Sequence, residues 1–335
     1  MCYGRPTARK VTAPKRRRAR LVQPKSGPSV PFEAPRFIWW DGRIHAWDDA
    51  SVHVSRLQWS ALGAPFEAMR AYFDPASSTS FVFGLDAHLR RMAHSMRVME
   101  IREPSIETLR EATLEVLRRN GARADEYIRI FAWFEDGAAY TTEQPTHAFV
   151  LSRTFPSRLA EDVSWTASVV SWRRLDETTV PVRVKAAANY QNSRLAALEA
   201  LRNGYDFGVL LNARGEVTEG PRECIFLVLD GVLVTPPLSA PVLDSITRRA
   251  VLRIATHLGI PVVERVVLRG ELYEATEMLA CSTASEIVPV VSVDKVVLGT
   301  GRPGPVTTRI RELFREVVYG RVELLADLRT AVSKP

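Results

Sequence analysis

A single lysine between an apolar run and three alanines is the feature that most constrains this chain. Lys185 follows the largely β-branched run 178–184 and precedes Ala186-Ala-Ala188, so a strand ending at the lysine is predicted. A lysine in such small, apolar surroundings is poorly solvated. Its ammonium form is disfavoured and its amine becomes nucleophilic, as a Schiff-base lysine requires. The ordinary alternative is a strand-end lysine whose charged head reaches solvent.

Length and charge exclude several classes of protein. The 335 residues are enough for two domains with a large core, and 46% apolar with 25% charged residues is typical of globular proteins. The apolar runs are too short to span a membrane. Residues 1–32 hold nine of the 45 Lys and Arg and no acid, so residues 33–335 carry 36 bases against 38 acids. The net charge of −2 on the body does not favour nucleic-acid binding.

The basic segment 1–32 and the cysteines bear on location. The segment is rich in Arg and Pro and is expected to be a disordered tail. Its composition also suits a transit peptide, but it has little amphipathic periodicity, so a solvated extension is favoured. Cys2, Cys224 and Cys281 form no metal-ligand or Cys-x-x-Cys spacing, and no metal site is predicted. Reduced cysteines fit a cytoplasmic protein.

The pattern along the chain predicts two domains. Residues 33–154 read as a small α+β domain, 155–161 as a linker, 162–320 as a larger strand-rich domain and 321–335 as a C-terminal extension. Helices are predicted from an N-cap at Asp86 and over 105–119, 193–203, 246–258 and 305–318. A hairpin turn is predicted at Asp230-Gly231.

One predicted helix start suits an anion. Asp244-Ser245-Ile246-Thr247 opens a helix that Gly259 ends, with apolar residues sharing one face. A helix N-terminus offers unpaired N–H groups and the positive end of the helix dipole, which favour a phosphate. Many helices begin this way without binding anything.

The surroundings of Lys185 carry a family resemblance. The motif Lys185-x-x-x-Asn-Tyr190-x-x-Ser, followed by Gly215-x-Val-Thr-Glu219-Gly, resembles the fold-type IV pyridoxal-phosphate enzymes. Within them it is most similar to the branched-chain amino-acid aminotransferases, with motifs in family order over residues 37–307. The resemblance implies an α/β fold, in which a small α+β N-terminal domain is joined to a larger strand-rich α/β domain. It also implies a homodimer or higher homo-oligomer.

The resemblance assigns roles around the cofactor pyridoxal 5′-phosphate. Lys185 would be the catalytic residue and would bind the cofactor covalently, while Tyr190 would lie near the phenolic oxygen of its ring. Glu219, at the end of a hairpin strand, would pair with the ring nitrogen. The phosphate would be held by Arg91 rather than Arg90, by the backbone of Ile246 and Thr247, and by the Thr283 hydroxyl.

Substrate contacts are implied by shorter motifs. Tyr127 and Arg129, with the backbone of Thr283 and Ala284, would hold the substrate carboxylate, and Phe66 would line the side-chain pocket. An ordinary half-buried strand is the alternative for Tyr127 and Arg129. The resemblance also suggests that Arg70 pairs with Glu223.

Some positions depart from the family pattern. Ala61-Leu62-Gly63 stands where relatives carry an aromatic residue, and Pro221, Arg222, Cys224 and Ser245 are also unusual. The missing aromatic residue predicts a wider pocket and a bulkier or more polar oxo acid.

The implied activity is pyridoxal-phosphate-dependent transamination between an L-amino acid and a 2-oxo acid, with a specialised, larger substrate as one option. Other fold-type IV enzymes remain alternatives, namely an aminodeoxychorismate lyase-like enzyme and a D-amino-acid or amine transaminase. A binding protein that kept the fold without turnover is a further alternative, which intact Lys185, Glu219 and Arg91 disfavour.

Overall fold

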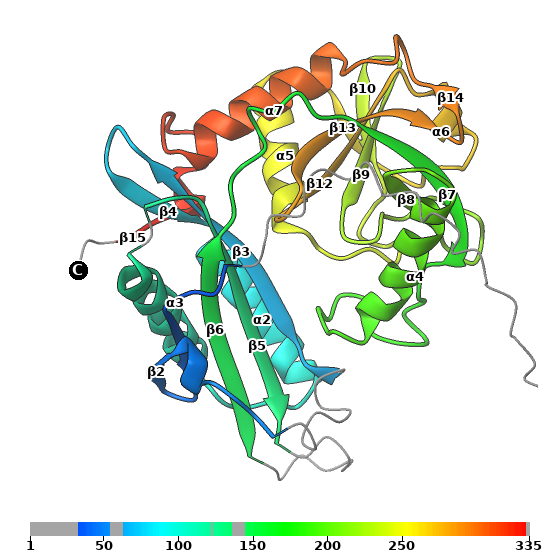
Figure 1. The fold of residues 1–335 in the computed structure, drawn as a ribbon. Helices are drawn as coiled ribbons and strands as arrows, with labels where there is room; N and C mark the ends of the chain where they lie inside the picture. Colours follow the sequence, from blue (N-terminus) through cyan, green and yellow to red (C-terminus); the bar gives the residue numbers. More distant parts are fainter. Residues whose placement is uncertain (1–32, 54–62, 122, 136–144, 333–335) are drawn as a thin grey trace, which may run out of the picture.

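The computed structural model describes residues 33–53, 63–121, 123–135 and 145–332, which form two domains side by side (Figure 1). The first domain is built on a seven-stranded antiparallel sheet in the order β15-β4-β3-β5-β6-β1-β2. Its strands are β1 (Phe37–Trp40), β2 (Arg43–Ala46), β3 (Phe66–Asp74), β4 (Thr79–Phe83), β5 (Glu126–Phe134), β6 (Thr146–Thr154) and β15 (Arg329–Val332).

Two helices cover one face of this sheet, α2 (Leu85–Val98) and α3 (Ile106–Asn120). Alternate residues of β5, Ile128, Ile130 and Ala132, are fully buried toward that side, as the two-residue period of a strand requires. The short 3₁₀ helix Trp47–Asp49 follows β2.

The start of α2 differs from the prediction. Gly84, not Asp86, is the N-cap, with a left-handed φ of 71°. A Cβ at Gly84 would lie 2.9 Å from Cγ2 of Ile246 in the second domain, so both the backbone conformation and the close approach require glycine. Asp86 therefore falls in the first turn, where it pairs with Arg110.

The second domain holds a mixed sheet in the order β11-β10-β9-β12-β13-β7-β8, with β14 paired to β13. The β13–β7, β7–β8 and β10–β11 pairs are parallel. Asp230 and Gly231 both have positive φ in the predicted turn between β9 and β10, as a type I′ hairpin needs. The strands are β7 (Trp165–Arg173), β8 (Phe207–Leu211), β9 (Cys224–Leu229), β10 (Val232–Thr235), β11 (Val262–Glu264), β12 (Glu277–Ser282), β13 (Glu286–Val293) and β14 (Val296–Val297).

Helices pack on both faces of the second sheet, so β12 is buried along its whole length. The Glu277 carboxylate accepts the N–H groups of Val306 (3.0 Å) and Thr307 (2.8 Å), which stabilises the start of α7. No described helix is long and apolar enough to cross a membrane. The helices are α4 (Asn189–Arg202), α5 (Ile246–His257), α6 (Glu271–Glu274) and α7 (Pro305–Val318).

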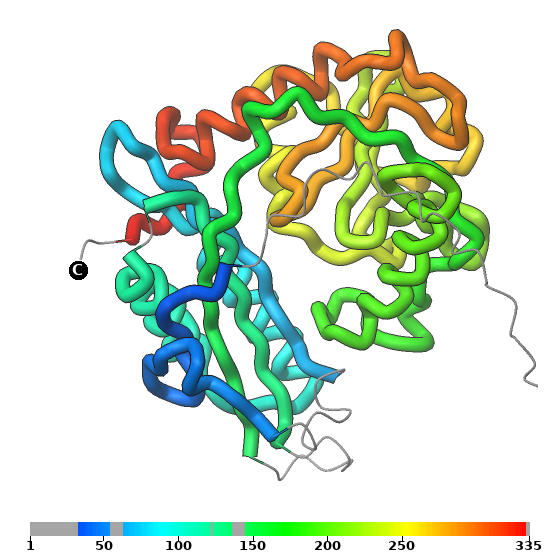
Figure 2. The backbone as a smooth tube through the Cα atoms, in the orientation of Figure 1, coloured from blue at the N-terminus to red at the C-terminus, as the bar shows by residue number. Residues whose placement is uncertain are grey.

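The chain returns to the first domain at its far end. Residues 321–335 show little pattern in the sequence, yet β15 pairs along β4 after the 3₁₀ helix Ala326–Leu328. Figure 2 shows this red segment beside the first domain. The predicted disordered tail, residues 1–32, lies outside the described residues.

Candidate functional site

The predicted site residues gather around one cavity between the two domains. The first domain contributes Phe66 from β3, Arg91 from α2, and Tyr127 and Arg129 from β5. Thr247 lines a small adjoining cavity together with His88 and Thr283. From the second domain, the main cavity is lined by the predicted residues Lys185, Tyr190, Glu219, Ile246, Thr283 and Ala284.

Lys185 is positioned by both domains. The preceding residues form turns instead of the predicted strand, because Asp176 accepts the N–H groups of Thr178 and Val180. The Lys185 carbonyl then accepts the N–H of Phe66 (2.8 Å), and its own N–H donates to Oγ of Ser95 on α2 (3.1 Å). The lysine backbone is thus fixed against the first domain.

The Lys185 amine lies in apolar and aromatic surroundings. Its Nζ is 2.5 Å from the Tyr190 hydroxyl and 4.7 Å from the centroid of the Phe66 ring, and the residue is 8% exposed. Burial, and then the charge of Arg91, lower the lysine pKa to about 8, although Glu67 opposes the shift. Roughly a fifth of the amine is therefore neutral at pH 7.4, against about a thousandth for an ordinary lysine.

This pKa gives a testable pH dependence. In the cofactor-free protein, we expect acylation of Lys185 to reach its half-maximal rate near pH 8, because only the neutral amine reacts. Site-resolved mass spectrometry across pH 6–11 measures the rate, with the exposed Lys295 as an internal reference for reagent decay. A midpoint near the ordinary lysine value of about 10.4 would contradict the burial argument.

Glu219 lines the same cavity from an irregular extended segment, not from the end of a strand. Its backbone carbonyl accepts the N–H of Leu210 in β8 (3.0 Å). Its carboxylate is 2.7 Å from the Arg174 guanidinium and accepts the N–H of Leu243 (3.0 Å). The carboxylate is therefore held in place at the cavity wall.

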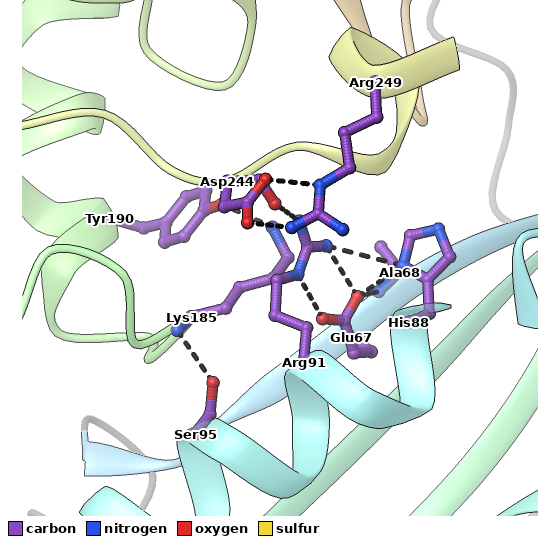
Figure 3. A network of polar contacts seen from close by, with 9 residues as sticks. All are labelled: Glu67, Ala68, His88, Arg91, Ser95, Lys185, Tyr190, Asp244 and Arg249. Carbon is purple, nitrogen blue, oxygen red and sulfur yellow. Dashed lines mark hydrogen bonds and ion pairs between the residues drawn. The ribbon is translucent and has the colours of Figure 1, made fainter. Parts of the chain in front are cut away.

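Arg91 belongs to a buried network that crosses the domain boundary (Figure 3). Its Nε and Nη2 donate to the two oxygens of Glu67 at 2.7 and 2.9 Å. Nη1 donates to the Asp244 carbonyl of the second domain at 2.8 Å. These bonds use three of the five guanidinium donors and leave two for a ligand. Arg90, as predicted, is exposed.

Glu67 and His88 set the charge of this network. Burial favours a neutral Glu67, but the Arg91 charge and the hydrogen bonds from His88 and Arg91 hold its pKa well below the usual range. Burial lowers the pKa of His88 despite Glu67. A neutral His88 donates its Nδ1–H to Glu67 over 2.7 Å. Glu67 therefore fixes both side chains as an anion.

The start of α5 fits the predicted phosphate site. The Ser245 side chain accepts the N–H of Arg248 (3.2 Å) as the N-cap. The N–H groups of Ile246 and Thr247 have no acceptor among the described residues. Unpaired donors at the start of a 12-residue helix, beside a guanidinium with free donors, form a suitable set for a dianionic phosphate.

The other end of the cavity is aromatic and positively charged. Phe66 stacks on Phe131 with 5.1 Å between ring centroids and meets the edge of Tyr190 at 4.9 Å. The exposed Arg129 guanidinium lies 6.0 Å from the Tyr127 ring centroid. A ligand with an apolar part and a carboxylate would find matching groups here.

Of two predictions about neighbouring residues, one is wrong and one falls largely outside the described residues. The suggested Arg70–Glu223 pair is wrong: Arg70 donates to the carbonyls of Phe155 (2.6 Å) and Ala284 (3.3 Å), and lies 3.8 Å from Glu286. Glu223 instead accepts the Ser285 hydroxyl (2.8 Å). Arg70 thus supports the loop that carries Thr283 and Ala284. Ala61 and Leu62 lie outside the described residues, and Gly63 approaches Met99.

Glu67 and Arg174 are site residues that the sequence reasoning missed. Glu67 is a charged residue within a buried strand, which is a detectable signal, because a buried charge needs a partner. Arg174 follows the exposed Arg173 at the end of β7, and the sequence does not distinguish the two.

Comparisons with known proteins give one consistent result. Residues 64–293 match the family described as amino-transferase class IV. The chain is similar to the branched-chain-amino-acid aminotransferase of Salmonella typhimurium, with 37% identity over 86% of this chain and 94% of that protein. The branched-chain amino acid aminotransferase of Thermobaculum terrenum, solved in its PLP-form, has 39% identity and a TM-score of 0.87, covering 90% of this chain and 100% of that chain. The T.th. branched-chain amino acid aminotransferase complexed with N-(5′-phosphopyridoxyl)-L-glutamate has 33% identity and a TM-score of 0.82, covering 89% and 99%.

Proposed function

We propose that this chain, which belongs to the amino-transferase class IV family, transfers an amino group from an L-amino acid to a 2-oxo acid with pyridoxal 5′-phosphate as its cofactor. One observation carries the proposal: a buried lysine with a lowered pKa faces a cavity that also holds a fixed carboxylate and a helix N-terminus. That combination serves covalent amine chemistry on an anionic cofactor.

The residues of the cavity fit this cofactor. Arg91 and the free N–H groups of Ile246 and Thr247 would hold its phosphate, with the hydroxyl of Thr283 close by. Glu219 would bind the protonated ring nitrogen, and Tyr190 the phenolic oxygen. Related structures with the cofactor in its PLP or pyridoxamine 5′-phosphate form support the assignment. When bound, the cofactor supplies a sink for the electrons released as the Cα–H bond breaks.

The side chains of this protein would perform the remaining steps. The Lys185 amine accepts the proton from the substrate Cα and later returns it at a neighbouring carbon. Tyr190, 2.5 Å from Nζ, orients the amine, and the Phe66 ring shields it from water. The 2-oxo acid formed from the amino donor leaves before the acceptor 2-oxo acid binds, so the kinetics should follow a ping-pong scheme.

Substrate selection would occur at the aromatic end of the cavity. Arg129, Tyr127 and the Thr283-Ala284 backbone would hold carboxylate groups, and Phe66 would contact the side chain. The similar proteins are named for branched-chain amino acids, and the T.th. enzyme was solved with a glutamate adduct of the cofactor. We therefore propose glutamate and branched-chain or larger amino acids as the first substrates to test.

A panel of amino donors tests the proposal. We expect L-amino acids, but not D-amino acids or simple amines, to remove the visible absorbance of the bound cofactor, and a 2-oxo acid to restore it. Donor consumption without amination of an added oxo acid would favour a lyase. Failure to bind the cofactor, or no response to any donor, would contradict the proposal.

Pocket size gives a separate prediction about selectivity. If Ala61 lines the side-chain pocket, the wild type should prefer aromatic or polar oxo acids over 2-oxoisocaproate. Ala61→Tyr should then shift the ratio of specificity constants back toward 2-oxoisocaproate. Small changes in pocket size alter discrimination by about 1–3 kcal/mol, so a shift of roughly 10- to 200-fold is expected. A wild type that already prefers 2-oxoisocaproate, and is unchanged by the substitution, would show that this segment lies outside the pocket.

We also propose a cytoplasmic homodimer or higher homo-oligomer. Cys224 and Cys281 stand opposite each other on β9 and β12 and both are free, which fits a reducing compartment. Light scattering after size exclusion tests the assembly, and a monomer under assay conditions would contradict it.

A further inference from the structure

Arg174 forms a buried ion pair with Glu219 at the wall of the cavity. The Nη2–Oε1 distance is 2.7 Å, and the side chains are 6% and 9% exposed. Taking two charges out of water is costly, and the attraction between them offsets that cost only when the geometry is good and further hydrogen bonds are made. Such bonds are present on both partners.

Those further bonds reach a single segment of the second domain. Nε of Arg174 donates to the Pro241 carbonyl (3.3 Å), and the second oxygen of Glu219 accepts the Leu243 N–H (3.0 Å). In the following residue, the Asp244 carbonyl accepts a hydrogen bond from Nη1 of Arg91 (2.8 Å). Ser245 then caps α5. The ion pair thus holds the residues that lead directly to the N–H groups of Ile246 and Thr247.

We infer that Arg174 is a positioning residue that joins the two ends of the cofactor site. It holds Glu219 in place for the ring nitrogen, and through residues 241–244 it fixes the helix start that binds phosphate. The inference rests on the proposed function and deepens it, because it predicts that a residue beside the ring-nitrogen carboxylate controls phosphate affinity.

Three substitutions are expected to have different effects on the ion pair and on residues 241–244. Arg174→Gln removes the charge and shortens the side chain, so that Glu219 loses its partner and Pro241 its donor. Glu219→Gln removes the carboxylate charge and the acceptor of Arg174 Nη2, but it keeps one oxygen for the Leu243 N–H. Nε of Arg174 can still donate to Pro241, so both bonds to the segment remain. Arg173→Gln, at the adjacent exposed position, is the matched control.

Two binding measurements separate these cases. We would measure the dissociation constants of pyridoxal 5′-phosphate and of inorganic phosphate for the cofactor-free proteins by calorimetry. We expect Arg174→Gln to weaken both by about tenfold or more, the loss of roughly one charge-assisted hydrogen bond. Glu219→Gln should weaken the cofactor but change phosphate less than threefold, and Arg173→Gln should change neither.

The outcomes are distinguishable from failure of the proposed function. If the wild type binds no cofactor, the proposed function is wrong. If the wild type binds it and Arg174→Gln keeps wild-type affinity for phosphate, Arg174 does not position the helix start and the inference is overturned. Should Arg174→Gln fail to fold, Arg174→Lys keeps a charge for Glu219 without the second donor to Pro241. This variant should fold and bind phosphate more weakly than the wild type, and unchanged phosphate affinity would again overturn the inference.

Discussion

The Lys185→Ala protein is expected to have no measurable transamination, a loss of about 10⁴-fold or more. The substitution removes the only amine placed against both Tyr190 and Phe66 in the described part of the chain. Two functions depend on that amine, the covalent link to the cofactor and the transfer of the Cα proton. Single-turnover conversion of bound cofactor by an L-amino acid is the measurement.

Measuring the stability of Lys185 variants distinguishes a loss of activity from a loss of the folded state. With a pKa lowered to about 8, the folded protein binds fewer protons than the unfolded chain between that pH and about 10.5, so stability from this group rises with pH across this window. Below pH 8, the buried ammonium costs about 3 kcal/mol of folding stability.

Lys185→Met removes this cost without leaving a cavity. It should therefore be at least as stable as the wild type at pH 7, and as inactive as Lys185→Ala. Arg183→Ala, two residues earlier and exposed, should remain active. Near wild-type turnover of Lys185→Ala would remove the basis of the assignment.

Arg91→Ala should weaken cofactor binding by roughly ten- to a hundredfold, whereas Arg90→Ala should leave it unchanged. Arg91 carries the guanidinium donors beside the start of α5, and Arg90 points to solvent. Titration of each cofactor-free variant with pyridoxal 5′-phosphate measures the difference. Equal losses in both variants would contradict the orientation of α2.

Arg91→Ala should also destabilise the cofactor-free protein. Glu67 is fully buried and loses two of its charge-assisted bonds, and an uncompensated buried charge costs about 3–5 kcal/mol. The double substitution Glu67→Gln with Arg91→Ala should recover part of that stability but not the cofactor affinity. This result would separate folding from binding.

Features with a local cause were predictable from the sequence. The helix over 305–318 is observed as Pro305–Val318, and that over 246–258 as Ile246–His257. Apolar periodicity marks both, and the starts are set by Pro305 at the first helical position of one and by the Ser245 cap of the other. The motif on α2 correctly placed Arg91 inward and Arg90 outward.

Features that depend on distant partners were not predictable. The run before Lys185 has strand-like residues, but the Asp176 turn and the contact with Phe66 determine its conformation. The partners of Glu67 and Arg174 come from other elements of the chain, so no local pattern reveals them. The sequence indicated which residues meet at the site, and the structure adds what holds them there.

Strand β15 has a consequence for how this protein matures during synthesis. It pairs with β4, and Leu328, just before it, accepts the N–H of Gly84 (2.6 Å), the residue that opens the helix carrying Arg91. The first domain therefore stays one strand short until the ribosome has made residue 332, although most of that domain is translated first. Closing so long a loop is slow compared with local folding. We expect a nascent chain to acquire high affinity for phosphate ligands only after this strand has emerged from the ribosome and paired with β4.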